Sequence, residues 1–337
     1  MKTKQIIFTE AYKAELLDVD VLSPSDNDVT VELDFSAISA GTEKANFIGQ
    51  RNSVFSSENE SASFPRTVGY SSAGTVTAVG DKVAEFKIGD KVVVFGGGHK
   101  KLVTISKENV VKIPDGVSSA EASLAYIASF SVAAIRKTRL ELGESALVMG
   151  LGNLGLLAVM QLRAAGAYPI IAADPLAKRR DLSLKLGADY VFDPLEKDFS
   201  KKVRAICGGV NVCIEVTGVA DGLIAALDCM KKLGRIALLG CTRNSNFNID
   251  YYSKVHGPGI SLIGAHTLAR PERESAAGLW TQVDDIKSFL GLILGRRLNV
   301  KDMISDFYSP KDAQSVYDRI VRDKEFPVGA LFDWSGI

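Results

Sequence analysis

The chain has 337 residues, of which 46% are hydrophobic and 24% are charged, and these proportions exclude a disordered or fibrous protein. Its length predicts about two domains. The 40 Lys and Arg residues balance the 40 Asp and Glu residues, so no net field favours a nucleic acid or an anionic membrane as a partner.

The sequence predicts a cytoplasmic protein. Its most apolar stretch, residues 146–160, is too short for a membrane span and is interrupted by three glycines. The first residues contain no apolar signal core. The four cysteines form no CxxC pair, so we expect them to be small buried side chains in a reducing compartment.

The first 115 residues are predicted to be rich in β-structure. Short alternating or β-branched runs are separated by turn signals such as Val79–Lys82 and Ile113–Gly116. This close spacing favours a compact antiparallel barrel over βαβ units. The predicted strands are Gln5–Phe8, Val29–Phe35, Gly74–Val79, Lys91–Phe95 and Leu102–Ile105.

The pattern changes at Ser118, which forms a capping-box signature with Glu121 and predicts a helix that ends near Leu140. Strand and helix patterns then alternate, which predicts a doubly wound parallel sheet with helices on both faces. The predicted strands are Ala146–Met149, Pro169–Ala173, Tyr190–Phe192, Val210–Val216, Arg235–Leu239 and Ile260–Ile263, and the tail adds helical patterns at Trp280–Leu294 and Pro310–Lys324.

A glycine-rich turn follows the first strand of this sheet and opens a helix. In such a turn the first glycine permits the tight bend, the second lets a pyrophosphate approach the backbone, and the third lets helix and strand pack closely. The helix N-terminus adds a positive dipole end. We therefore expect a dinucleotide to bind at Gly150, Gly152, Asn153, Leu154 and Gly155.

The residues after the next strand bear on the choice of dinucleotide. Asp174 ends that strand, and its carboxylate favours NAD because it would accept from a ribose 2′-hydroxyl and repel a 2′-phosphate. Arg179, in the basic run 178–180, either grips the adenosine phosphate, which keeps NADP as the alternative, or lies on a solvated helix face. Later strands end at Thr217-Gly218 and at Gly240, where we expect further cofactor contacts.

The order of barrel, dinucleotide fold and return segment resembles the medium-chain dehydrogenase/reductase family. The resemblance implies a GroES-like catalytic domain over residues 1–117, a Rossmann NAD(P)-binding domain over 118–269, and a segment over 270–337 that returns to the catalytic domain. It also implies a cofactor contact at Ala265, and homodimers or homotetramers joined near Ile260–Ile263. The residues that carry it are Ala40–Glu43, Val68–Gly74, Phe86–Val92, Ile113–Gly116, Gly150–Gly155 and Leu186–Asp189.

The sequence departs from the zinc-dependent members of this family. Those members carry a cysteine where Ala40 stands and a histidine–glutamate pair where Tyr70 and Ser71 stand. Their third ligand falls near Leu124–Ala128, a stretch without Cys, His, Asp or Glu. Because zinc needs thiolate, imidazole or carboxylate donors, we expect no metal ligands and no zinc.

Without a metal, side chains must handle the proton of the reaction. The resemblance places Thr42 where a hydroxyl relay is found, Tyr70 in the cleft at a former ligand position, and His99 on a loop that lines the substrate pocket. Each has a structural alternative, since Thr42 would also cap a helix, Tyr70 would fill the vacated metal cavity, and His99 would lie in a solvated turn.

We therefore expect a zinc-independent NAD(P)-dependent oxidoreductase acting on a small alcohol or carbonyl substrate. The segment Ser39–Glu43 resembles members that act on alcohols, polyols or sugar-like molecules. A quinone or enoyl reductase of the same family is the second hypothesis. A dinucleotide-binding redox sensor without turnover is the third, because the zinc ligands are lost.

Overall fold

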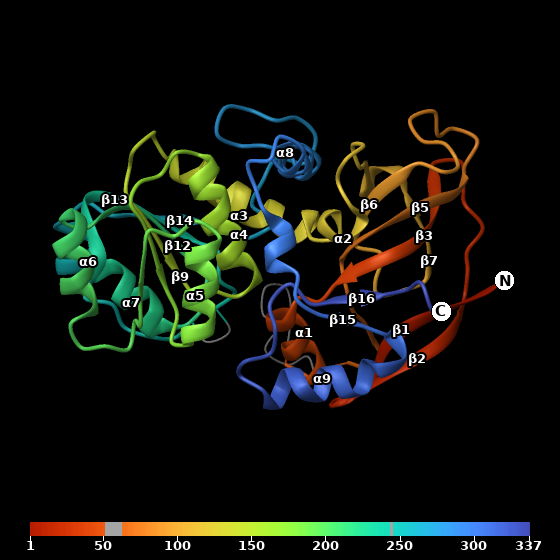
Figure 1. Cartoon of the computed structure of the whole chain (residues 1–337), viewed down its shortest axis with the longest axis horizontal. Coiled ribbons are helices and arrows are strands. Elements are labelled where there is room, and N and C mark those ends of the chain that lie inside the picture. The colour runs from red at the N-terminus through yellow and green to blue at the C-terminus, as the bar shows by residue number, and fades with distance from the viewer. Residues whose placement is uncertain (51–62, 243–244) are drawn as a thin grey trace. The chain divides into compact units, whose positions relative to one another are not determined.

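The computed structural model describes residues 1–50, 63–242 and 245–337, and the chain folds into two units (Figure 1). The first unit comprises Met1–Ile127 and Ile304–Ile337, and the second comprises Ala128–Met303. These divisions lie later in the chain than the expected ones at 117/118 and 269/270. Helix α2 (Ser119–Ala122) packs on the strands of the first unit, and residues 270–303 belong to the second.

Two sheets form most of the first unit. A three-stranded sheet has the order β2-β1-β4, and a seven-stranded sheet has the order β15-β16-β3-β5-β6-β8, with β7 also paired to β3. Apart from the parallel pair β15 and β16, the strands pair antiparallel, as expected for a GroES-like barrel. The elements are β1 Lys2–Glu10, β2 Lys13–Asp20, β3 Asp28–Ala37, α1 Ala40–Phe47, β4 Arg66–Thr67, β5 Ser71–Val79, β6 Lys91–Phe95, β7 Leu102–Ser106, η1 Lys107–Asn109, β8 Val110–Lys112, β15 Phe307–Tyr308, η4 Pro310–Asp312, α9 Ala313–Arg322 and β16 Leu331–Asp333.

The last part of the chain completes the core of the first unit. Strand β16 pairs antiparallel with β3, and helix α9 buries the face formed by Ala313, Val316, Tyr317 and Ile320, whose spacing is that of one helix face. Trp334 follows β16 and is 0% exposed. Only residues 304–337 therefore return to the first unit, because residues 270–303 pack within the second.

The second unit is a six-stranded parallel sheet with the order β11-β10-β9-β12-β13-β14. The chain builds outward from β9 first to β10 and β11 and then, on the other side, to β12, β13 and β14, so the order reverses at β9. Ligands of such sheets bind at the carboxyl end of the strands where the order reverses. The elements are α3 Ala125–Thr138, which begins before the division at residue 127, β9 Ala146–Met149, α4 Asn153–Ala164, β10 Ile170–Ala173, α5 Ala177–Lys185, β11 Tyr190–Phe192, α6 Phe199–Cys207, β12 Val210–Glu215, α7 Ala220–Cys229, β13 Met230–Leu238, η2 Tyr252–His256, β14 Ser261–Gly264, α8 Gln282–Leu294 and η3 Val300–Met303.

The predicted capping box at Ser118 is present. The Ser118 hydroxyl accepts the Glu121 backbone N–H, and the Glu121 carboxylate accepts the Ser118 N–H. The single helix expected from Ser118 to about Leu140 is instead two helices, α2 and α3, which are separated by Ser123 and Leu124. Both separating residues are buried, so packing outweighs helix continuity here.

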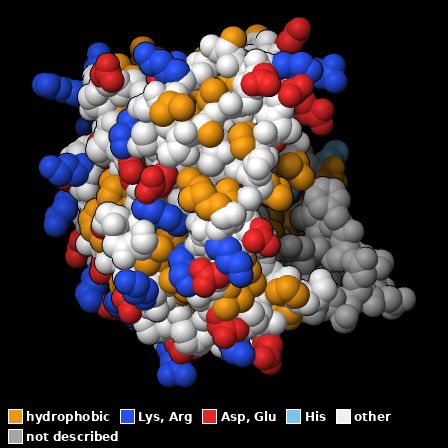
Figure 2. Space-filling view, turned by 90° about the vertical axis from the view of Figure 1, so that its right-hand side faces the viewer, with side chains coloured by type: hydrophobic (Ala, Val, Ile, Leu, Met, Phe, Trp, Pro, Cys, Tyr) orange, Lys and Arg blue, Asp and Glu red, His pale blue; other side chains and the backbone are white. Residues whose placement is uncertain are grey.

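The surface carries charges of both signs. Figure 2 shows Lys and Arg interspersed with Asp and Glu over the face turned to the viewer, with hydrophobic side chains scattered between them. Within the described part of the chain, no helix is both long enough and apolar enough to cross a membrane.

Candidate functional site

The glycine-rich turn lies directly after β9, at the carboxyl edge where the strand order reverses. Gly150 has a φ of +92°, and a Cβ on Gly155 would lie 1.8 Å from the Gly150 carbonyl oxygen. The fold therefore requires glycine at 150 because of the left-handed backbone, and at 155 because of the close carbonyl oxygen. A Cβ on Gly152 would meet nothing within 4 Å, so Gly152 borders open space at the start of α4.

Helix α4 begins at Asn153 without a side-chain cap, because the residue before it is Gly152. Its twelve residues give a positive dipole end at the turn. A helix N-terminus next to the open space at Gly152 is a setting suited to a pyrophosphate. The dinucleotide contacts expected at Gly150, Gly152, Asn153, Leu154 and Gly155 stay a prediction.

Asp174 connects the end of β10 to the glycine-rich turn. Its carboxylate is 4% exposed and accepts the Leu151 N–H at 2.8 Å through Oδ2 and the Leu176 N–H at 2.9 Å through Oδ1. The Arg179 guanidinium lies 3.8 Å from Oδ2, whereas Arg180 donates to the Asp174 and Pro175 carbonyl oxygens. Each carboxylate oxygen has a second acceptor position, so Asp174 can support the turn and accept from a ribose hydroxyl as well.

A second acid, which the sequence analysis did not single out, organises the end of β12. Glu215 is 3% exposed, and its carboxylate accepts from the backbone N–H of Thr217 at 2.8 Å and from the Thr217 hydroxyl. Burial raises the pKa of Glu215. A Cβ on Gly240 would lie 2.4 Å from the Gly218 nitrogen, so the ends of β12 and β13 meet closely.

Ala265, the remaining expected cofactor contact, follows β14. Its backbone N–H donates to the Leu238 carbonyl at 3.1 Å, and its side chain is 3% exposed.

A sequence signal could have revealed Glu215. It is an acidic residue at the end of an apolar strand, almost directly before the Thr217-Gly218 turn.

The structure brings Thr42 and Tyr70 together in the first unit, with Ser39 between the ends of β3 and α1. The Tyr70 hydroxyl donates to the Ser39 hydroxyl oxygen. Burial raises the pKa of Tyr70 to about 12, against the opposing effect of hydrogen bonds to Ser39 and Thr42. The phenol is therefore neutral at physiological pH and is linked to two other hydroxyl groups.

His99 does not lie on an exposed loop wall. Its side chain is 0% exposed, with Nδ1 2.7 Å from the Ser36 hydroxyl oxygen and Nε2 3.1 Å from Glu43 Oε2. The edge-on ring of Phe332 lies 5.0 Å away, and Gly69 packs against the imidazole. The expected pocket-lining position is corrected in this way, because the ring is enclosed by the core of the first unit.

An aromatic ring packs against Tyr70. Tyr126 contacts Tyr70 edge-on at 5.7 Å between ring centroids and stacks on Phe95 at 5.0 Å. Ser71, beside Tyr70, donates its hydroxyl to the Ser123 carbonyl at 2.5 Å. Ser39, Glu43 and Tyr126 lie in segments quoted from the sequence, but none was assigned a role in the site, because their proximity to Tyr70 or His99 depends on tertiary packing.

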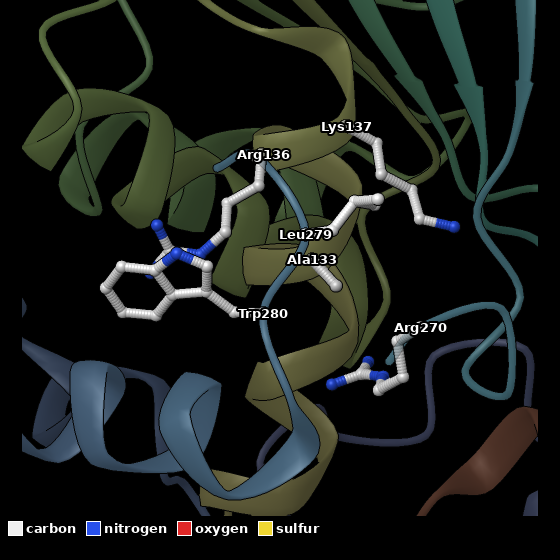
Figure 3. A pocket seen from close by; sticks show the side chains of 7 residues that line it. Ala133, Arg136, Lys137, Arg270, Leu279 and Trp280 are labelled. Carbon is white, nitrogen blue, oxygen red and sulfur yellow. The ribbon is translucent and has the colours of Figure 1, made fainter. Parts of the chain in front are cut away.

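Two hollows of the second unit are lined by other residues than these. The first contains Arg136, whose guanidinium lies 3.3 Å from the ring centroid of Trp280 (Figure 3), and it leaves no room for a water molecule. The second has about 390 Å³ among α3, α4 and α8. None of the expected site residues lines either hollow. Asp285 joins α8 to α3 by accepting from Arg136 at 2.9 Å, and joins α8 to the segment after β14 by accepting from Arg270 at 3.3 Å.

Comparison with known proteins matches both units to sequence families. The family described as alcohol dehydrogenase GroES-like domain matches residues 25–115, and the family described as zinc-binding dehydrogenase matches residues 153–281. An L-threonine 3-dehydrogenase of Pyrococcus abyssi is 31% identical over 295 residues, which cover 78% of this chain and 81% of that protein. A D-guloside 3-dehydrogenase of Escherichia coli is 24% identical over 322 residues, which cover 89% and 91%.

Solved structures share the fold over the whole chain. An oxidoreductase/dehydrogenase of unknown specificity from Escherichia coli superposes with a TM-score of 0.85 at 18% identity, covering 99% of both chains. A protein from Sinorhizobium meliloti described as a zinc-binding dehydrogenase was solved with NADP and has a TM-score of 0.81 at 18% identity, covering 99% of both chains. An Escherichia coli alcohol dehydrogenase was solved with NADH and has a TM-score of 0.83 at 16% identity, covering 98% of this chain and 99% of that one.

The fold class expected from the sequence is thus confirmed, with a GroES-like domain and a parallel Rossmann sheet. The identity of 31% with a dehydrogenase that the chain covers over four-fifths of its length places the two proteins in one family. The chain belongs to the medium-chain dehydrogenase/reductase family and is an NAD(P)-dependent dehydrogenase of the alcohol dehydrogenase type.

Proposed function

We propose that this dehydrogenase works without zinc on the hydroxyl or carbonyl group of a small polyol or sugar-like substrate, with Tyr70 as the proton-handling residue. The observation that carries the proposal is the chain of hydroxyl groups formed by Thr42, Tyr70 and Ser39. The family resemblance places these residues in the segments where zinc-dependent members hold their metal. The relatives named for threonine and guloside oxidation support a polar substrate with hydroxyl groups.

The donor set does not suit zinc. Ala40 offers no donor, Ser71 uses its hydroxyl on a backbone carbonyl, and Tyr70 is a neutral phenol. Among residues 1–50, 63–242 and 245–337, no group of three or more His, Cys, Asp or Glu side chains could hold a metal ion. Elemental analysis of protein purified without added metal should find less than stoichiometric zinc, and one tightly bound zinc per chain would contradict the proposal.

We propose NAD as the preferred dinucleotide. When bound, it supplies or accepts the hydride of the reaction. Asp174 supports this choice because its buried carboxylate would repel a 2′-phosphate, although Arg179 lies 3.8 Å away and reduces that repulsion. Fluorescence titration should give a lower dissociation constant for NADH than for NADPH. The reverse order would reassign the cofactor to NADP.

The raised pKa of Tyr70 gives it the role of an acid. A phenol has a single proton, which Tyr70 donates to Ser39 in this structure. With a substrate carbonyl bound, that proton would turn to the carbonyl oxygen, while the phenol oxygen accepts the Ser39 hydroxyl proton. As negative charge develops on the carbonyl oxygen, Tyr70 gives up its proton and regains one from the Ser39 and Thr42 hydroxyl groups, which are resupplied by solvent. In the oxidation direction the alcohol proton passes to the phenol oxygen as the phenol proton passes to Ser39 or Thr42 and on to solvent.

The decisive experiment is a panel of sugars, polyols, aldehydes, quinones and enones, assayed by the absorbance of NADH and NADPH. Tyr70→Phe should lower kcat by about 100-fold while the dissociation constant of NADH stays unchanged, because general acid catalysis typically contributes 10²–10⁴-fold. Tyr12→Phe, at a position 56% exposed, is the control. Turnover of quinones or enones alone would favour a quinone or enoyl reductase. Binding without any turnover would favour a redox sensor.

We also propose that two copies of the chain join along β14. This strand is the outer strand of the six-stranded sheet, and it lies where the family resemblance places the joining strand. Ser261, Leu262 and Gly264 are exposed along it. An exposed strand edge offers unpaired backbone groups to a second strand, so a continuous sheet across two copies would satisfy them.

A further inference from the structure

The core of the first unit contains a carboxylate with three hydrogen-bond donors. Glu43, on α1, is 1% exposed. Its Oε1 accepts the Ser39 backbone N–H at 2.8 Å, and its Oε2 accepts the Tyr317 hydroxyl at 2.7 Å and faces His99 Nε2 at 3.1 Å. A buried charge of this kind is costly unless it is fully hydrogen-bonded, so each of these donors has a defined task.

The hydrogen bonds behind His99 hold its imidazole in place. The Trp334 indole N–H donates to the Ser36 hydroxyl oxygen at 2.9 Å. That hydroxyl lies 2.7 Å from His99 Nδ1 and hydrogen-bonds with it. With Nδ1 engaged in this way, Nε2 is directed at Glu43 Oε2.

Glu43 is connected to the hydroxyl chain through Ser39. The Ser39 backbone is fixed from both sides, because its N–H donates to the Glu43 carboxylate and its carbonyl accepts the Glu43 N–H at 2.8 Å. The Ser39 hydroxyl accepts from Tyr70. One residue thus joins the buried carboxylate to the phenol. The charge of Glu43 also contributes to the raised pKa of Tyr70.

We propose that Glu43, held by His99 and Tyr317, is a positioning residue that fixes Ser39 and thereby aims the Tyr70 hydroxyl at the substrate oxygen. This inference rests on the function proposed above for Tyr70. It assigns His99 the task of orienting Glu43 from the interior, in place of direct contact with substrate. It also gives a task to Tyr317, which bonds Glu43 directly, and to Trp334, which bonds the Ser36 hydroxyl next to His99.

The test is a double-mutant cycle between Glu43→Gln and Ser39→Ala, with Tyr70→Phe as reference. Each single variant should lower kcat by about 10-fold to 100-fold and leave the dissociation constant of NADH unchanged, because misplacement of a reacting group affects the chemical step. If Glu43 acts through Ser39, the double variant should lose no more than the worse single variant. Glu121→Gln is the matched control, since Glu121 accepts the N–H of Ser118 in the same way on α2.

The same double-mutant cycle is measured a second time with a different readout, the pH at which Tyr70 ionises. This pH is obtained from the tyrosinate absorbance of each variant after subtraction of the same variant carrying Tyr70→Phe. Glu43→Gln should lower it because a negative charge near the phenol is removed, and should raise it in part because Ser39 is released and its hydrogen bond to the phenol weakens. In the Ser39→Ala background only the first effect remains, so Glu43→Gln should lower the ionisation pH by more than it does alone. This readout does not require turnover.

The outcomes separate the two proposals. Additive losses in kcat together with independent effects on the ionisation of Tyr70 would overturn the role of Glu43, while a large effect of Tyr70→Phe would keep the proposed function. A silent Tyr70→Phe with a coupled ionisation cycle would overturn the proposed function and keep the Glu43–Ser39–Tyr70 connection. If Glu43→Gln does not fold, Glu43→Asp replaces it in the kcat cycle, since it withdraws the carboxylate from Ser39. Because Glu43→Asp keeps the charge, its effect on the ionisation of Tyr70 should come only from the release of Ser39 and should disappear in the Ser39→Ala background.

Discussion

Gly69 shows how a single residue next to Tyr70 depends on the buried His99. Its φ is +85°, and a Cβ added there would lie 2.5 Å from His99 Cγ. Gly89 has a similar φ of +91° but no atom within 4 Å of an added Cβ. The two glycines share the backbone conformation and differ in the space around it, so they form a matched pair within the first unit.

We expect Gly89→Ala to cost about 1–2 kcal/mol of unfolding free energy, from the left-handed backbone alone. Gly69→Ala should cost a further ~1–3 kcal/mol, because the imidazole must also move. The measurement is the urea midpoint of unfolding of each variant, monitored by a spectroscopic probe located in the first unit. Equal costs would show that the core around His99 yields without strain.

Buried phenols make the protein sensitive to alkali. Burial raises the pKa of Tyr70 to about 12, and burial together with the charge of Glu43 raises that of Tyr317 well above its ordinary value of 10.0. Above pH 10 the unfolded chain loses these protons while the folded chain retains them, so the unfolded state is favoured as the pH rises. Stability should therefore fall between pH 10 and pH 12.

Tyr70→Phe should make this fall shallower, since it removes one of the two phenols. Urea midpoints at neutral pH and between pH 10 and 12 measure the slope, with Tyr12→Phe as the exposed control. An unchanged slope in Tyr70→Phe would mean that Tyr70 ionises as readily in the folded chain as in the unfolded one.

At this scale the sequence reveals residues whose role follows from their neighbours along the chain. Tyr70 and Thr42 could be named because they occupy motif positions, and the structure joins them by a hydrogen bond between their side chains. Glu43 belongs to the same motif as Thr42, but its role could not be predicted, since its partners His99 and Tyr317 lie 56 and 274 positions away. His99 was assigned to a pocket because local sequence does not reveal burial by Gly69 and Phe332.

At the scale of elements, the turn between β9 and α4 contains one glycine that folding requires, Gly155, and one that borders open space, Gly152. Gly155→Ala would bring a Cβ to 1.8 Å from the Gly150 carbonyl and should destabilise the second unit by ~2 kcal/mol or more. Gly152→Ala meets open space and should leave the unfolding temperature within about 2 °C.

Gly152→Ala should nevertheless weaken NADH binding by about 10-fold or more, because the added methyl group occupies the space into which a pyrophosphate fits. NADH fluorescence titration and thermal unfolding of the same preparation separate the two effects. Unchanged NADH affinity in Gly152→Ala would place the dinucleotide away from the turn.

Strands made of consecutive buried apolar residues were predicted well, and strands with few buried residues were not. The strand Ala146–Met149 agrees with the structure at both ends, because four buried apolar residues precede a glycine-rich turn. Strand β2 was missed, since only one of its eight residues is buried and its pairing with β1 supplies what its own pattern lacks. The long helix after Ser118 was predicted without its interruption because Ser123 and Leu124 are not helix breakers.

At the scale of the whole molecule, the outer strand β14 leads to a prediction about assembly. Leu262 is 38% exposed on this strand, and Leu262→Lys places a charge on the edge. Sedimentation analysis should find the unaltered protein as a dimer or tetramer and Leu262→Lys as a smaller species. Leu195→Lys, at a position 74% exposed outside β14, is the control. A monomeric unaltered protein would contradict the proposed joining strand.

The two-domain plan was accessible from the sequence because the period of the hydrophobic pattern changes near residue 118. The division of the final third was not accessible, since helix α8 contributes to the second unit through the buried Asp285 and its two arginine partners. A pattern of apolar residues identifies a helix but does not reveal which sheet or helix receives its buried face.

The discontinuity of the first unit has a consequence for synthesis in the cell. Tyr317 and Trp334 emerge from the ribosome only after all of residues 128–303, whereas Glu43 and Ser36 emerge near the beginning. In a nascent chain Glu43 therefore lacks the Tyr317 hydroxyl, and Ser36 lacks the Trp334 indole N–H, until translation is nearly finished. Chains stalled after the second unit should hold a folded nucleotide domain beside an unfinished barrel, which chaperones and proteases can recognise.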